Sequence, residues 1–393
     1  MSVTAAEGWK AAGVRAGTKP SGELDLALVV SDRPATVAGA FTTSKVPSAH
    51  VQLCRPRVAA GHSRGFCVSA GIANAFTGEP GVRDAEVMAS AAAAAVGVEE
   101  NDMLVAATGT IGERLPMDLV LAGVSEAAAS LSVDGGAAAA DAIRTTDAYA
   151  KTAIRTIEID GTTVTIGGMA KGAGMIAPRM VPQATLLVFL TTDASASAEL
   201  LRDVVTGALP RSFNAITVDG CMSTSDTVLL FANGAAGVNA HGSKAFADAV
   251  TDVMAELAYA VVADGEGASR VIRVRVTGAA GDADAYAAAR EVAGSVLVRC
   301  AIFGGDPNYG RAVQALGQAG CALDPDKLRI GVGGVELSVG GEPTGRVEEA
   351  AKAIAGDGDV IIDIDLGLGS SSFEYLTCDL TPDYVRFNAE YTT

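Results

Sequence analysis

The sequence predicts a layered α/β protein, and three observations lead to that prediction. Short apolar or alternating segments, typical of strands, take turns along the chain with longer alanine-rich segments of helical period. Of the 393 residues, 49% are hydrophobic and 19% are charged, which supplies ample material for a buried core. No repeat or low-complexity linker interrupts the mixture. We therefore expect an α+β layered sandwich, and composition alone shows no domain boundary.

The elements of the first half follow from local pattern. Apolar runs too short for helices predict strands, and the alternating segment 162–166 predicts one exposed on one side. Segments rich in helix formers predict helices, one of them after Pro116, which suits a first helical turn. Four glycines and two prolines predict a loop over 167–182. The strands are expected at 26–30, 65–69, 103–107, 162–166 and 184–190, and the helices at 84–96, 119–131 and 137–144.

The second half repeats this alternation. Helical period predicts four helices, and short apolar segments predict four strands. A fifth strand, 270–276, alternates basic and apolar residues, as a strand with one solvated face does. The helices are expected at 197–209, 244–262, 282–296 and 311–319, and the strands at 270–276, 328–331, 335–339, 360–366 and 373–376.

Charge and residue usage exclude several classes of function. With 29 Lys+Arg against 46 Asp+Glu, the net charge of −17 disfavours binding to nucleic acid. The six cysteines form no CxxC pair, so we expect buried, reduced thiols. The three histidines stand alone, so no metal site is expected. There is no basic, apolar leader and no run long enough for a membrane helix. We expect a soluble, cytoplasmic protein.

The segment 168–178 is unusual for a structural loop. Its glycines permit positive φ and close backbone approach, and Lys171 stands among them. The predicted strand that follows carries a hydroxyl at its second residue, Thr185. The order of residues is not that of a phosphate-binding loop. On local evidence a plain turn and a functional loop remain equally open.

Several motifs in this chain resemble, in order, those of the ornithine acetyltransferase family, also called bifunctional glutamate N-acetyltransferase. The resemblance covers nearly the whole chain and includes its carboxyl end. Its residues are Thr108-Gly109-Thr110-Ile111-Gly112, Leu115-Pro116-Met117-Asp118, Thr145-Thr146-Asp147, Lys171-Gly172-Ala173-Gly174-Met175-Ile176, Ala184-Thr185, Asp219-Gly220, Ser223-Thr224-Ser225-Asp226-Thr227, Asp264-Gly265-Glu266-Gly267, Asp306-Pro307-Asn308 and Asn388-Ala389-Glu390-Tyr391-Thr392-Thr393.

The resemblance implies an N-terminal-nucleophile enzyme of the α/β class. The precursor would cut itself between Ala184 and Thr185, giving fragments 1–184 and 185–393 that assemble as an α2β2 heterotetramer. The freed amine of Thr185, with an ordinary pKa near ~8, would act as base for its own hydroxyl. By resemblance, Thr185 carries an acetyl group from N2-acetyl-L-ornithine to L-glutamate in a ping-pong cycle. No cofactor is implied, although acetyl-coenzyme A is an alternative donor.

The family's site residues map onto this sequence one by one. The oxyanion hole maps to Thr108 and Gly109, and the substrate contacts map to Thr145, Lys171, Thr185, Glu266, Asn388 and Thr393. Lys171 suits a substrate carboxylate, and Glu266 suits an ammonium. Without the resemblance, each residue has a plain alternative: a tight turn, a solvated charge, a strand residue or a frayed chain end.

The chain also departs from the family pattern. Val181-Pro182-Gln183 is an apparent insertion just before the scissile bond, and Phe76 stands where a small residue is common. Because of these departures, two other functions stay open. One is an amidohydrolase or aminopeptidase, in which water replaces glutamate. The other is an uncleaved, non-catalytic paralogue that binds amino acids or partners.

Overall fold

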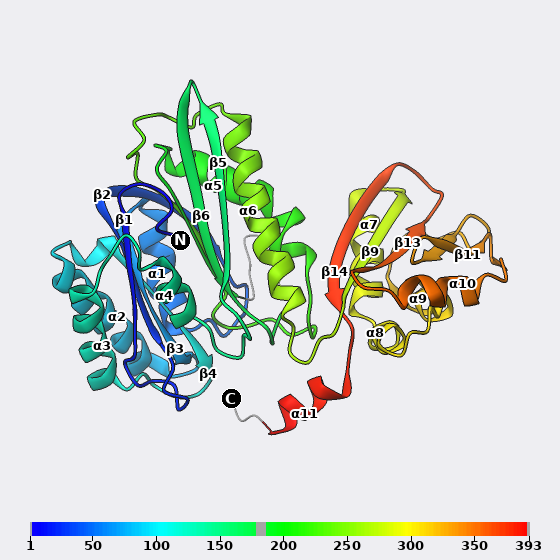
Figure 1. The fold of residues 1–393 in the computed structure, drawn as a ribbon, viewed down its shortest axis with the longest axis horizontal. Helices are drawn as coiled ribbons and strands as arrows, with labels where there is room; N and C mark the ends of the chain where they lie inside the picture. Colours follow the sequence, from blue (N-terminus) through cyan, green and yellow to red (C-terminus); the bar gives the residue numbers. More distant parts are fainter. Residues whose placement is uncertain (1, 178–185, 391–393) are drawn as a thin grey trace. The chain divides into compact units, whose positions relative to one another are not determined.

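The protein divides into two compact units, seen in a computed structural model that describes residues 2–177 and 186–390 (Figure 1). The first unit holds Met1–Asn214 and Cys221–Val261, and the second holds Ala215–Gly220 and the chain from Val262 onward. Composition did not reveal this boundary, because it crosses a continuous helix rather than a linker. The unit boundary also differs from the expected cleavage boundary at 184/185, which lies outside the described residues.

The first unit is built on an eight-stranded sheet. Its strands follow the order β4-β3-β2-β8-β7-β6-β5, with β1 paired to β2. The pairs β3–β4 and β7–β8 are parallel, and the others are antiparallel. The strands are β1 (Trp9–Val14), β2 (Leu26–Phe41), β3 (His62–Ile72), β4 (Met103–Thr110), β5 (Lys151–Ile159), β6 (Thr162–Lys171), β7 (Leu187–Thr192) and β8 (Thr227–Ala232).

This sheet folds over on itself into two layers. The register of β2 against β3 shifts between Val30 and Ala35, and after the shift β2 pairs with β8. The ring of Phe66 on β3 stacks on that of Phe189 on β7, with centroids 4.1 Å apart. In a flat sheet these strands would lie about 14 Å apart, at three strand spacings. The long strand β2 therefore turns the sheet into a sandwich with an aromatic core.

Helices cover both outer faces of the sandwich, which confirms the predicted layered α/β class. Helices α1 to α3 pack against the layer of β1 to β4, and α4 packs on β1 (Figure 1). On the other layer, α5 packs against β2 and β8, and α6 lies over Gly168 of β6. The helices are α1 (Ala49–Ala59), α2 (Gly78–Val96), α3 (Met117–Ala129), α4 (Gly136–Ala142), α5 (Ala198–Ala208) and α6 (Lys244–Ala263).

The second unit is a six-stranded sheet with helices on one face. Its strand order is β12-β11-β10-β13-β9-β14. Among the described strand pairs of this sheet, β13–β9 is parallel and the others are antiparallel. Strand β9 alternates buried and solvated positions, as its sequence predicted. The elements are β9 (Val271–Ala279), α7 (Asp282–Gly294), α8 (Val296–Phe303), α9 (Tyr309–Gln318), β10 (Arg329–Val332), β11 (Val335–Val339), β12 (Glu342–Pro343), α10 (Val347–Ile354), β13 (Val360–Asp365), β14 (Ser371–Cys378) and α11 (Pro382–Glu390).

The predicted loop over 167–182 begins too early. Strand β6 continues through Gly167 and Gly168 to Lys171. A Cβ on Gly167 would lie 2.1 Å from the carbonyl oxygen of Ser2, and one on Gly168 would lie 2.9 Å from a methyl of Val253 on α6. These glycines therefore permit close packing on both sides of a strand, a role that local pattern does not distinguish from a turn.

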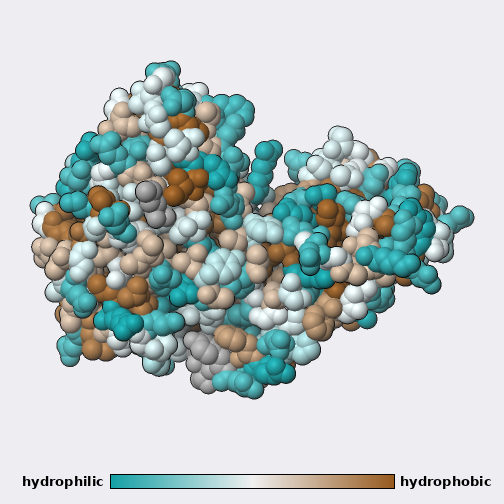
Figure 2. Space-filling view, viewed as in Figure 1, coloured by the Kyte–Doolittle hydropathy of each residue, from teal (hydrophilic) through white to brown (hydrophobic). Residues whose placement is uncertain are grey.

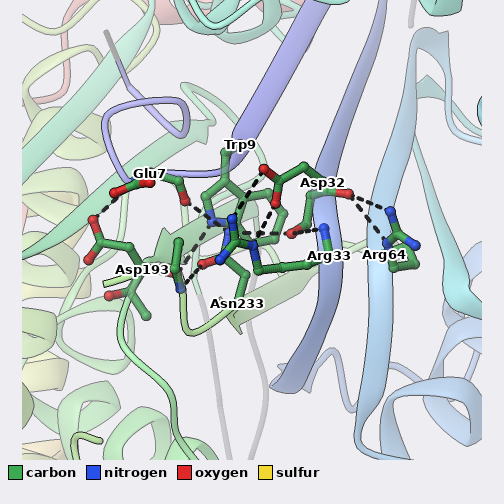
Figure 3. Close-up of polar contacts among 10 residues, drawn as sticks. Glu7, Trp9, Asp32, Arg33, Arg64, Asp193 and Asn233 are labelled. Carbon is green, nitrogen blue, oxygen red and sulfur yellow. Dashed lines mark hydrogen bonds and ion pairs between the residues drawn. The ribbon is translucent and has the colours of Figure 1, made fainter. Parts of the chain in front are cut away.

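The N-terminal segment is fastened to the end of β7 opposite Leu187 (Figure 3). Asp193 accepts a hydrogen bond from the backbone N–H of Glu7 at 3.1 Å, and Asn233 donates to the carbonyl of Glu7 at 2.9 Å. The indole of Trp9 donates to the carbonyl of Thr192 at 3.3 Å. Because β7 rises by ~3.3 Å per residue, this network lies about 16 Å from the strand's first residue.

Within the described residues, no helix is long and apolar enough to cross a membrane. On the face seen in Figure 2, hydrophilic residues surround the apolar ones.

Candidate active site

Lys171 and Thr108 lie on strands of the first unit and contact each other. The Lys171 ammonium donates a hydrogen bond to the Thr108 hydroxyl oxygen at 3.1 Å, and both residues are buried. Lys171 ends β6 and Thr108 lies near the end of β4, five strand positions away in the sheet order. A flat sheet would separate them by about 24 Å. Closure of the sandwich brings together two residues that the sequence assigned to one site.

Asp147 connects this pair with Thr145. Its side chain is fully buried. One carboxylate oxygen accepts from the Gly172 N–H and from the Lys151 ammonium, each at 2.6 Å, and the other accepts from the Thr145 N–H at 3.0 Å. Burial alone would raise the pKa of Asp147, but the charges of Lys171 and Lys151 outweigh it and lower that pKa to about 2. Asp147 is therefore an anion that fixes the backbone beside two predicted site residues.

Gly109 follows Thr108 in a conformation that glycine alone adopts readily. Its φ is +127°, and it pairs with Gly71 on β3. A Cβ at this position would lie 2.2 Å from the carbonyl carbon and oxygen of Gly71. The two backbones can approach this closely only because residue 109 carries no side chain. This contact fixes the path of the predicted oxyanion-hole segment.

The predicted nucleophile Thr185 and the scissile Ala184 lie outside the described residues, and so does the insertion Val181-Pro182-Gln183. The residues that follow them are well placed in the fold. Leu186 is buried, and its carbonyl accepts from the Thr227 N–H at 2.8 Å. Leu187 pairs across the sheet with Lys171. The chain therefore enters β7 beside the Lys171–Thr108 pair, directly after Thr185 in sequence.

His50 is buried beside the same region, and no role was predicted for it from the sequence. Its Nδ1 accepts from the Ala107 N–H at 3.2 Å, and its Nε2 lies 3.1 Å from the Ser225 carbonyl. Because Nδ1 is an acceptor, Nε2 carries the proton and donates it to Ser225. The ring therefore links Ala107, which precedes Thr108, to Ser225, which lies two residues before the start of β8. Burial lowers the pKa of His50 to about 4, so the ring is neutral near pH 7.

The neutral ring of His50 makes a pH-dependent contribution to stability. In the unfolded chain the imidazole takes up a proton below pH ~6.5, whereas in the folded protein it does so only near pH 4. The contribution is therefore present above pH ~6.5 and is lost as pH falls. We expect the free energy of unfolding to drop by about 2 kcal/mol between pH 6.5 and 5 on this account. Urea unfolding of wild type and His50→Gln at both pH values measures the difference, and equal pH dependence in both proteins would contradict it.

Two of the remaining predicted contacts, Glu266 and Asn388, lie in the second unit. The amide of Asn388 on α11 donates to the Glu266 carboxylate at 3.0 Å. Glu266 is half-buried and Asn388 is exposed. Thr393 lies outside the described residues. The structure thus groups the predicted residues into one cluster in each unit: Thr108, Gly109, Thr145 and Lys171 in the first, and Glu266 with Asn388 in the second.

The cysteines are only partly as predicted. Cys54, Cys67 and Cys378 are buried and Cys300 and Cys321 are partly buried, but Cys221 is exposed. Burial raises the pKa of Cys54 to about 11 and that of Cys67 to about 12, so these thiols stay protonated and unreactive. Within residues 2–177 and 186–390, no group of three or more His, Cys, Asp or Glu side chains is arranged to hold a metal ion.

Two sheet layers covered by helices, with Lys171 of β6 hydrogen-bonded to Thr108 of β4, give the layered α/β fold that the sequence predicted for an N-terminal-nucleophile enzyme. The sequence profile of the ArgJ family matches residues 10–393. The arginine biosynthesis bifunctional protein ArgJ of Symbiobacterium thermophilum is 47% identical to this chain, over 100% of this chain and 98% of that protein. The chain therefore belongs to the ArgJ family, and the prediction of an acyltransferase of arginine biosynthesis is confirmed.

Two further proteins are also similar in sequence to this chain. The ArgJ protein of Thermobifida fusca is 42% identical over the full length of both chains. Among solved structures, the ornithine acetyltransferase of Mycobacterium tuberculosis, in complex with ornithine, is 40% identical, with a TM-score of 0.42 over 45% of this chain and 95% of that chain.

Proposed function

We propose that the protein is a self-cleaving acetyltransferase that moves an acetyl group from N2-acetyl-L-ornithine to L-glutamate. The observation that carries this proposal is the buried Lys171–Thr108 pair, which lies where the chain enters β7 directly after Thr185. Membership of the ArgJ family over nearly the whole chain supports the same reaction.

The proposed cycle has two matched halves. The Thr185 hydroxyl attacks the acetyl carbonyl of N-acetylornithine, its proton passes to the freed α-amine, and ornithine leaves with a proton on its nitrogen. Glutamate's amine then attacks the acetyl-Thr185 ester and takes the acetyl group, which restores the hydroxyl. Each half passes through a tetrahedral oxyanion, for which the Thr108 hydroxyl and the Gly109 N–H are the proposed donors. The cycle needs no cofactor, although acetyl-coenzyme A remains an alternative donor to be assayed.

Substrate contacts are proposed for both clusters. Thr145 and Lys171 lie in the first unit, where the ammonium suits a carboxylate. Glu266 and Asn388 lie in the second, where the carboxylate suits an ammonium. Thr185 and Thr393 complete the proposed set. The proposed amino-acid substrates carry both a carboxylate and an ammonium, so each cluster offers a charged group that suits one of these two groups.

The sheet order explains how proposed fragments 1–184 and 185–393 would stay together after the cut. Strands β7 and β8 of the second fragment lie between β2 and β6 of the first. Their backbone hydrogen bonds and shared core would hold the fragments as one fold in the proposed α2β2 assembly. A cytoplasmic location suits the proposed pathway.

One assay separates the transferase from a hydrolase. Purified protein is incubated with N-acetylornithine, with and without glutamate, and ornithine and N-acetylglutamate are measured. We expect ornithine to form repeatedly only with glutamate, in equal amount to N-acetylglutamate. Ornithine released equally fast without glutamate would mean that water is the acceptor, and would contradict the transferase.

A further inference from the structure

The Thr108 hydroxyl is held in one orientation. Its oxygen accepts the hydrogen bond from Lys171 at 3.1 Å. An ammonium has three donors and no acceptor, so the threonine proton cannot point toward it. Among the residues that the structure describes, Thr108 donates its own proton to no acceptor. That proton is therefore directed away from Lys171 and is available to another oxygen.

The Asp147 carboxylate holds the backbone next to Lys171 and attracts its ammonium. The Asp147 carboxylate binds the N–H of Gly172, the residue that follows Lys171, at 2.6 Å. This bond fixes the backbone from which the lysine side chain starts. The Lys171 charge is among the causes that keep Asp147 ionised, and the attraction is mutual.

We propose that Asp147 and Lys171 are positioning residues of the oxyanion hole, in which Asp147 fixes Lys171, and Lys171 turns the Thr108 hydroxyl so that its proton donates to the developing oxyanion. This inference rests on the proposed function. It adds a role for Lys171 beyond contact with a substrate carboxylate, and it gives Asp147 a role in transition-state stabilisation. An accepted bond from a cation also makes the hydroxyl a stronger donor.

The proposal separates effects on kcat from effects on KM. A donor aligned with the oxyanion acts in the transition state, so its loss lowers kcat. A contact with the substrate carboxylate acts in the ground state as well, so its loss raises KM. If Lys171 acts through Thr108, removing the lysine from a protein that already lacks the hydroxyl should cost little more.

The test is a double-mutant cycle on the mature enzyme. Thr108→Val, Lys171→Met and their combination are assayed with N-acetylornithine and glutamate, with rates referred to the cleaved chain measured by intact mass. We expect kcat to fall roughly 100-fold in Thr108→Val, and on the order of 10- to 100-fold in Lys171→Met. The kcat of the double variant should equal that of Thr108→Val alone. Thr108→Ser, which retains the hydroxyl, should recover most of kcat.

Asp147→Asn tests whether Asp147 acts on the oxyanion hole through Lys171 and Thr108, and Asp193→Asn is its matched control. Both aspartates are buried in the first unit and accept backbone N–H groups, but Asp193 lies at the opposite end of β7 (Figure 3). We expect both substitutions to lower the unfolding temperature and only Asp147→Asn to lower kcat. If Asp147→Asn does not fold, the cycle between Thr108 and Lys171 still decides the question.

Multiplicative losses in the double variant, or a Lys171→Met protein with raised KM and unchanged kcat, would overturn the proposal. So would equal kcat in Asp147→Asn and Asp193→Asn. Failure of the proposed function is distinguishable, because wild-type protein would then produce no N-acetylglutamate from these substrates.

Discussion

Replacing Thr185 with alanine is expected to leave one intact, inactive chain. The same hydroxyl is proposed both to attack the Ala184 carbonyl during self-cleavage and to carry the acetyl group afterwards. Removing it therefore abolishes both steps, whereas the sheet that contains β7 keeps its core. Intact-mass measurement should show a single species near 39.4 kDa after long incubation, and no ornithine should form.

Thr185→Ser is the matched control, because it retains a hydroxyl and, after cleavage, an amine. We expect it to cut and to turn over at a reduced rate. Wild-type protein should yield a second fragment whose N-terminal sequence reads Thr-Leu-Leu-Val. Cleavage of Thr185→Ala at the same bond, or fully active wild type without that terminus, would eliminate Thr185 as the nucleophile. An intact wild type with no activity would instead favour the non-catalytic paralogue.

Replacing Gly109 with alanine is expected to damage both stability and catalysis. Its φ of +127° costs an L-residue about 1 to 3 kcal/mol. The added Cβ would also lie 2.2 Å from the backbone of Gly71, a contact that must be relieved by moving β4 away from β3. Overpacking of this kind adds about 1 to 3 kcal/mol. We expect the free energy of unfolding to fall by roughly 2 to 6 kcal/mol in total, and kcat to fall roughly 100-fold as the oxyanion-hole segment moves.

Gly112→Ala separates the two causes. Gly112 stands in the same motif with a φ of +93°, but a Cβ there would meet nothing within 4 Å. This variant carries backbone strain without the clash. We therefore expect its free energy of unfolding to fall by about 1 to 3 kcal/mol and its kcat to stay nearly normal. Urea unfolding and steady-state rates on both variants measure the difference. Equal losses in the two variants would show that the approach of Gly109 to Gly71 does not matter.

Much of the secondary structure could be predicted from local pattern. The helix at 244–262 and the strand at 270–276 match α6 and β9 to within three residues at each end, because each has a clear period and enough length. The helix at 84–96 is the carboxyl-terminal part of α2, which begins six residues earlier at Gly78. Strand β8 was not predicted, although it is wholly buried. Its run Val228–Ala232 is as long and as apolar as the segment 26–30, which was predicted as a strand, so local pattern carried this signal and the prediction omitted it.

The candidate site was predicted by motif rather than by geometry. The sequence places Lys171 and Thr108 in separate motifs, and only the folded sheet brings the Lys171 ammonium within 3.1 Å of the Thr108 hydroxyl. Asp147 lies in the motif Thr145-Thr146-Asp147, but no role was predicted for it. Its bonds to Gly172 and Lys151 form only in the folded backbone. His50 gave no signal, since a lone histidine shows its partners only when Ala107 and Ser225 are in place.

The sequence by itself determined the fold class, the family and the order of the motifs that carry the proposed chemistry, because these depend on residue type and on short-range period. The tertiary structure alone decided that β2 bends the sheet into two layers and that glycines at 167 and 168 belong to a strand. It also decided that Lys171 contacts Thr108 and that Asp147 lies close enough to Lys171 to be affected by its charge. The physical reason is that each of these contacts joins residues distant in the chain. Their free energy arises only when the core has closed and water has been excluded from the charges.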